Sequence, residues 1–101
     1  MPLLNLADIA RDLPDTWKSR VLAQAGACNI KVLKMDGQAS PAETHDYNEA
    51  LIVISGVLRL CVQGEDIDVA AGDMYLAPAG IAHAVAQGSH GVLMIIDPIE
   101  S

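Results

Sequence analysis

Short apolar runs separated by turn-forming residues recur along most of this chain of 101 residues. Apolar or alternating segments occupy residues 20–24, 28–35, 51–54, 57–62, 67–69, 74–77, 82–86 and 92–96. Glycine, proline or aspartate lies between most of them, as at Asp36-Gly37 and Gly64-Glu65-Asp66. Strand-like runs with a turn signal about every 8 to 12 residues are typical of β-sandwiches and barrels. The pattern therefore predicts an all-β fold.

The segment before these runs has the spacing of a short helix. Asn5 can act as its N-cap, Ile9 and Leu13 fall on one face, and Pro14 ends the pattern. A helix of this length is not stable alone, so it must dock on the rest of the fold. The sequence thus predicts a helix over residues 5–13.

Length and composition indicate a single domain over residues 1–101. The net charge is −7 with only six Lys and Arg residues, which disfavours nucleic acid and anionic membranes as partners. No run of 18 apolar residues is present, so we expect no membrane span. The N-terminal residues lack the pattern of a signal peptide, and the two cysteines, Cys28 and Cys61, fit reduced buried thiols. Together these features predict a cytoplasmic protein.

Two glycine-bracketed blocks contain the residues with the clearest chemical potential. Between Gly37 and Gly56 lie Glu43, His45 and Glu49, and His83 follows the second block, Gly72-x5-Pro78-x-Gly80. Imidazole nitrogens and carboxylate oxygens are the usual ligands of a catalytic metal.

The local structure decides whether these side chains can meet. On a strand Glu43 and His45 share a face, and a tight return would bring Glu49 beside His45. A helix would also place His45 and Glu49 on one face, but Pro41 and the β-branched run 51–54 disfavour it. His83 belongs to a different hairpin, and the residues alone do not show that it reaches the same place.

The two blocks resemble the two signature motifs of the cupin superfamily. In that family the first motif reads Gly, five residues, His, one, His, three or four, Glu, six, Gly. The second reads Gly, five, Pro, one, Gly, two, His, three, Asn. This chain keeps the spacing of both motifs, and the resemblance covers residues 28–96. It implies a double-stranded β-helix, a jelly-roll-like barrel, of the small single-domain type often labelled mannose-6-phosphate-isomerase-like.

By this resemblance, His45, Glu49 and His83 fall on three metal-ligand positions inside the barrel. The chain departs from the family at Glu43, which replaces the first histidine, and at Gln87, which replaces the closing asparagine. Glu43 is then a fourth ligand, a spectator beside a two-histidine, one-carboxylate set, or the trace of a lost metal. The residues do not distinguish Mn, Fe(II), Zn and Ni.

The resemblance implies a metal-binding barrel that binds or acts on a small polar metabolite, with isomerase-type or dioxygenase-type chemistry. Two alternatives remain open: a small-molecule-binding barrel without turnover, and a structural barrel without metal. No residue is singled out as catalytic. The resemblance and the cost of an open sheet edge also predict a homodimer.

Overall fold

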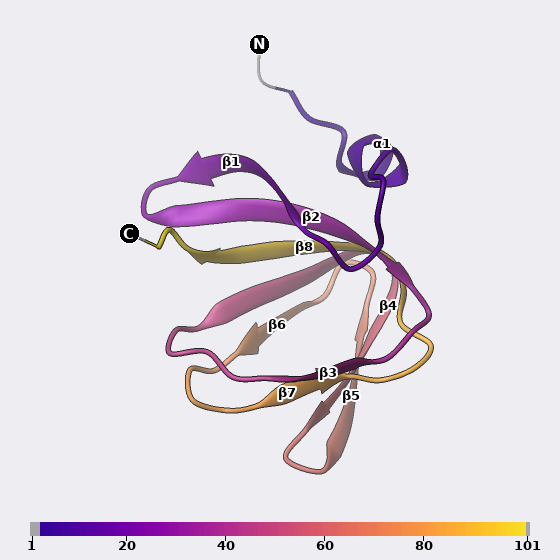
Figure 1. Ribbon diagram of the computed structural model, residues 1–101, viewed down its shortest axis with the longest axis vertical. Helices are drawn as coiled ribbons and strands as arrows, with labels where there is room; N and C mark the ends of the chain where they lie inside the picture. Colours follow the sequence, from indigo (N-terminus) through magenta and orange to yellow (C-terminus); the bar gives the residue numbers. More distant parts are fainter. Residues whose placement is uncertain (1–2, 101) are drawn as a thin grey trace.

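The computed structural model describes residues 3–100, which form one short helix and eight strands of a curled sheet (Figure 1). In chain order these elements are α1 (Leu6–Arg11), β1 (Arg20–Ala25), β2 (Cys28–Asp36), β3 (Ser40–Glu43), β4 (Glu49–Val62), β5 (Glu65–Ala70), β6 (Met74–Ala77), β7 (His83–Val85) and β8 (His90–Pro98). Within the described residues, no helix is long and apolar enough to cross a membrane. The predicted all-β class with a short N-terminal helix is confirmed.

Strand β4 organises the sheet because it pairs with four other strands. It pairs with β6 and β8 over its first half and with β5 and β7 over its second half. The main strand order is β1-β2-β8-β4-β7-β3. The register between β4 and β8 shifts between Val53 and Ser55, and such irregularities increase bend and twist. The sheet therefore curls, and β2, β3, β4, β7 and β8 surround one interior space (Figure 1).

The interior is aliphatic, as expected for a chain without phenylalanine. Burial alternates along β4, so one face of the strand points inward. The main cluster of buried side chains comprises Leu33, Met35, Leu51, Val53, Leu58, Leu60, Val62, Val69, Ala77 and Leu93. A smaller cluster of Ala10, Leu13 and Val32 anchors α1 on the outer side of β2. Asn5 caps α1 by accepting a hydrogen bond from the Asp8 amide, as predicted.

Two details of the sequence-based interpretation are wrong. The strand-like segments identified from the sequence omit residues 38–42, but Ser40–Glu43 is strand β3. Pro41 is compatible with a strand there because β3 ends the main strand order, and an edge strand has a free side for a residue without an N–H. The runs 51–54 and 57–62 were expected to be separate strands, but Ser55-Gly56 lies within the continuous strand β4.

Gly56 and Gly91 allow β4 and β8 to approach each other closely. The two residues are register partners, with φ of 79° and 102° respectively. A Cβ atom on Gly56 would overlap the His90 carbonyl oxygen, and one on Gly91 would overlap the Ser55 carbonyl oxygen. Both glycines are therefore required by space as well as by backbone conformation.

Asp36 ties the segment after α1 to the end of β2. Its carboxylate accepts hydrogen bonds from the Trp17 indole N–H at 2.6 Å, the Thr16 hydroxyl at 2.8 Å and the Gln38 amide at 3.1 Å. Trp17 also donates its backbone N–H to the Lys34 carbonyl at 2.9 Å. These contacts hold Trp17 in a left-handed conformation with φ of 61°. The Trp17 hydrogen bond is the largest cause that lowers the pKa of the Asp36 carboxyl.

Replacing Gly56 with alanine should destabilise the fold by about 3 kcal/mol, because a left-handed conformation costs about 1–2 kcal/mol and the overlap with β8 adds about 1–3 kcal/mol. Gly64→Ala is the matched control, since Gly64 has a similar φ of 81° and open space at the Cβ position. Gly64→Ala should lose only the stability that the left-handed conformation costs, about 1–2 kcal/mol. Urea unfolding in EDTA measures both changes, and equal losses would contradict the close-approach argument.

Replacing Asp36 with asparagine should destabilise the protein at pH 7, because a carboxylate accepts these three hydrogen bonds better than an amide does. The folded-state pKa of Asp36 is lowered, so its contribution to stability is present above the ordinary value of 3.8 and is lost as the pH falls through the folded-state value. The difference between wild type and Asp36→Asn should therefore shrink in acid.

Thermal unfolding at a series of pH values, followed by the fluorescence of the single tryptophan, measures this difference. Asp15→Asn is the control, because Asp15 is exposed in the same segment and its carboxylate accepts no hydrogen bond from the described residues. A difference between wild type and Asp36→Asn that stays constant down to pH 2 would contradict the prediction.

Candidate metal centre

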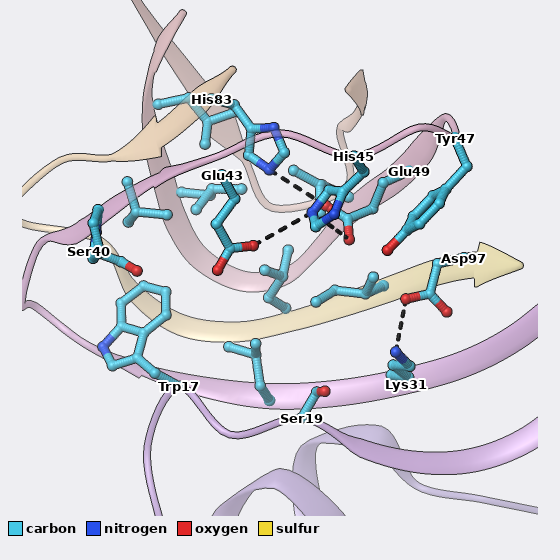
Figure 2. Close-up of a pocket in the computed structure, with 18 residues that line it drawn as sticks. Trp17, Ser19, Lys31, Ser40, Glu43, His45, Tyr47, Glu49, His83 and Asp97 are labelled. Carbon is cyan, nitrogen blue, oxygen red and sulfur yellow. Dashed lines mark hydrogen bonds and ion pairs between the residues drawn. The ribbon is translucent and has the colours of Figure 1, made fainter. Parts of the chain in front are cut away.

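The concave side of the sheet encloses a cavity of about 270 Å³. Its walls are largely aliphatic: Leu33, Leu51, Leu58, Leu60, Val85, Leu93 and Ile95. Against this lining, one group of histidine and glutamate side chains converges from β3, β4, β7 and the connection between β3 and β4 (Figure 2). A polar cluster in such a cavity is the usual form of a small-molecule or metal site.

Backbone pairing brings the two sequence blocks together. Glu43, the last residue of β3, is the register partner of His83, the first residue of β7. His45 lies in the connection between β3 and β4, and its carbonyl accepts a hydrogen bond from the Gly80 amide at 2.8 Å. The Asn48 side chain accepts another from the Ala79 amide at 2.9 Å. The connection between β3 and β4 is thus tied to the loop that precedes β7, and this brings His83 to the residues of the first block.

The donor atoms of this group lie close together. His45 Nε2 is 3.4 Å from Glu43 Oε2 and 3.9 Å from Glu49 Oε2, while His83 Nε2 is 3.4 Å from Glu49 Oε1. The two imidazole centroids are 5.6 Å apart. One donor atom from each of Glu43, His45 and His83 lies within 4.8 Å of the other two. Glu49 is outside that compact trio, but each of its oxygens faces one imidazole.

Burial differs sharply within the group. The side chains of Glu49 and His83 are each 9% exposed, whereas that of Glu43 is 61% exposed. Burial raises the pKa of the Glu49 carboxyl above its ordinary value, the two imidazoles partly offset this, and the Asp97 and Glu43 carboxylates raise it further. Burial thus disfavours the charged form of Glu49, which a nearby cation would stabilise.

Two imidazole nitrogens are left without a hydrogen bond in this arrangement. Among residues 3–100, buried His45 Nε2 and His83 Nδ1 have no partner, although His45 Nε2 faces two carboxylates. A buried polar atom without a partner is costly, and a metal ion would satisfy the lone pair of His45 Nε2. Two imidazoles and two carboxylates are a donor set that suits a divalent transition metal. The residues present thus fit such an ion.

The structure brings together all four residues singled out from the sequence: Glu43, His45, Glu49 and His83. The connection from 44 to 48 is not helical, so the helical alternative for His45 and Glu49 is wrong. Gln87, which replaces the asparagine of the family motif, does not line the cavity.

Sequence reasoning did not place Trp17, Lys31 or Asp97 in the cavity. Trp17 lines it, and so does Tyr47, which stacks on His45 with ring centroids 4.9 Å apart. Lys31 and Asp97 line it as an ion pair with Nζ and Oδ2 2.7 Å apart. A signal for Lys31 existed, since it shares a strand face with Leu33, where a core residue is expected.

Comparison with known proteins identifies the family. The model of the cupin domain family matches residues 32–98, which is more than half of the chain. The chain therefore belongs to the cupin family, as the resemblance predicted. No curated protein matches the chain.

Solved structures share the fold over nearly the whole chain. A cupin-2 domain-containing protein of Shewanella frigidimarina is 28% identical, with a TM-score of 0.88 over 97% of this chain and 96% of that protein. A Streptococcus pyogenes protein of unknown function is 26% identical, with a TM-score of 0.75 over 98% of this chain and 89% of that one. A Neisseria meningitidis protein is 16% identical, with a TM-score of 0.83 over 96% and 99%. At that identity the likeness concerns the fold alone.

Proposed function

We propose that this cupin binds one divalent transition metal ion through His45, His83, Glu49 and Glu43, and that the ion holds an oxygen of a small polar molecule in the cavity. The observation that carries the proposal is His45 Nε2, a buried nitrogen that faces two carboxylates and has no hydrogen-bond partner among the described residues. Glu49 supports it, because this buried carboxylate lies between two imidazoles.

The donor set favours Mn, Fe(II), Zn or Ni over Mg and Ca, since imidazole suits transition metals and the alkaline-earth ions prefer oxygen alone. Glu49 is the principal carboxylate of the proposal because it is buried and contacts both histidines. Glu43 is the outer donor, held beside His83 by the pairing of β3 and β7. Its exposure to solvent makes it the weaker ligand.

When bound, the ion would act as a Lewis acid toward a carbonyl or hydroxyl oxygen of the ligand. The protein would orient the ligands of the ion and exclude water from the cavity. Tyr47 orients the His45 ring by stacking on it, and the leucines of the cavity wall exclude water. Isomerase-type and dioxygenase-type reactions both use metals held with open positions. A screen of small metabolites with the metal-loaded protein separates turnover from binding.

Metal binding should depend on the two histidines of the cavity. Protein purified without chelator or nickel resin should hold about one ion per chain by mass spectrometry. Removing a residue that only hydrogen-bonds to a metal ligand typically lowers metal affinity about 10–100-fold. His45→Ala and His83→Ala remove ligands themselves, so each should lower the metal affinity by more than that. Metal at 100 times its dissociation constant should stabilise the wild type by about 2.7 kcal/mol.

His90→Ala is the matched control for these variants, because His90 is exposed and is not among the residues that line the cavity. Its metal affinity should equal that of the wild type. Metal in less than about a tenth of the wild-type sites, with no uptake of Mn, Fe, Zn or Ni, would overturn the proposal and favour a structural barrel.

The two glutamates should contribute unequally. Glu49→Gln should lower metal affinity about 100-fold or more, whereas Glu43→Gln should lower it about tenfold. Competition titration with a chromogenic chelator measures both. An unchanged affinity in Glu43→Gln would make Glu43 a spectator beside a two-histidine, one-carboxylate set. A larger loss in Glu43→Gln than in Glu49→Gln would reverse the assignment.

A further inference from the structure

A buried ion pair forms another part of the cavity wall. Lys31 on β2 and Asp97 on β8 both line the cavity, and Lys31 Nζ lies 2.7 Å from Asp97 Oδ2 (Figure 2). The Asp97 side chain is only 6% exposed and that of Lys31 is 23% exposed. Neither residue belongs to the proposed metal ligands.

This pair is poorly explained as a stabilising contact. Burying two charges costs desolvation free energy, which is recovered only when the geometry is good and the remaining hydrogen-bonding groups are satisfied. Here Asp97 Oδ1 is buried and has no partner among the described residues. Lys31 has three N–H donors, and among the described residues only Asp97 Oδ2 accepts a hydrogen bond from them. An unused acceptor and unused donors on residues that line a cavity are what a ligand requires.

The ion pair lies within reach of the same ligand as the metal group. Ala50 on β4 is the register partner of Ile96 on the antiparallel strand β8. Glu49 and Asp97, the next residues on the two strands, therefore lie on the same side of that pair. Figure 2 shows the Tyr47 hydroxyl between the Glu49 and Asp97 carboxylates. One small molecule bound beside Glu49 would therefore meet Asp97 and Lys31 next.

The chemistry of the pair selects the group that it binds. A carboxylate or phosphate would be attracted by Lys31 but repelled by Asp97, and an ammonium group would meet the reverse. A hydroxyl donates one hydrogen bond and accepts another, so it satisfies Asp97 and Lys31 together without a net charge.

We propose that Lys31 and Asp97 form a subsite for an uncharged hydroxyl group, and that the cavity takes a small hydroxylated molecule with its other end at the metal. The inference rests on the proposed metal site, because it assigns only the second end of the ligand. It assigns to these residues a role in ligand selection.

The test uses simple acids of three to five carbons with a carboxylate head for the metal and different tails. The four tails are methyl, hydroxyl, ammonium and carboxylate, as in butyrate, 4-hydroxybutyrate, 4-aminobutyrate and succinate. Metal content is measured first by mass spectrometry. Binding to metal-loaded protein is then measured by calorimetry and by the fluorescence of Trp17, which lines the cavity.

In the wild type, the hydroxyl-tailed acid of the best length should bind about tenfold or more tightly than the other three tails. Asp97→Asn leaves Lys31 without its counter-ion, so the preference should move to the carboxylate tail. Lys31→Met leaves Asp97 alone, so it should move to the ammonium tail.

Either single variant leaves a buried unpaired charge and can fail to fold. The double variant Lys31→Met, Asp97→Leu removes both charges, and it should keep wild-type stability and metal content while losing the hydroxyl preference. A purely structural ion pair would give the opposite result, with lower stability and an unchanged order of tails.

The two proposals fail in different ways. Absence of metal in the wild type overturns the proposed function. Full metal content with no hydroxyl preference, or with no binding of any tail, overturns the Lys31–Asp97 subsite and leaves the metal site intact.

Discussion

The pairing of β4 with four other strands is the constraint on which this structure depends. One continuous strand serves β6 and β8 along its first half and β5 and β7 along its second. A single strand can do this only if the sheet bends sharply around it. The register shift near Ser55 and the contact of Gly56 with Gly91 permit that bend. The cavity on the concave side is a consequence of this bend.

The same pairing determines where the polar side chains lie. Glu49 is the first residue of β4, and Asp97 lies on the neighbouring strand β8, one residue beyond the partner of Ala50. Glu43 and His83 are paired across β3 and β7, and a hydrogen bond from Gly80 to His45 joins the loops. The four residues converge through backbone hydrogen bonds, so their side chains need no attraction of their own. Such a scaffold can hold the buried charges close together before a metal binds, and this arrangement favours metal binding.

The sequence predicted the fold class because turn residues at regular spacing indicate strands. It predicted the metal-ligand positions His45, Glu49 and His83 only through the resemblance to the cupin motifs, since the residues alone did not show that His83 reaches the first block. Strand β3 escaped prediction because Pro41 disfavours a strand unless its edge is free, and edge position is a property of the assembled sheet. Lys31 and Asp97 escaped for a similar reason: they are 66 positions apart, and their contact exists only once β2 pairs with β8.

The charges of the cavity offer a reason for glutamate at position 43, where the cupin motif has histidine. Lys31 and Asp97 neutralise each other. With neutral imidazoles, as metal ligation requires, the charges that remain in the donor group are those of Glu43 and Glu49. A divalent ion would cancel these two charges, whereas a histidine at position 43 would leave one positive charge that an anionic ligand could balance. Glutamate in place of histidine at position 43 thus removes the electrostatic advantage that an anionic ligand would have at the metal. Selection at the far end of the ligand then rests on the Lys31–Asp97 pair, which accommodates an uncharged hydroxyl group whatever oxygen binds the metal.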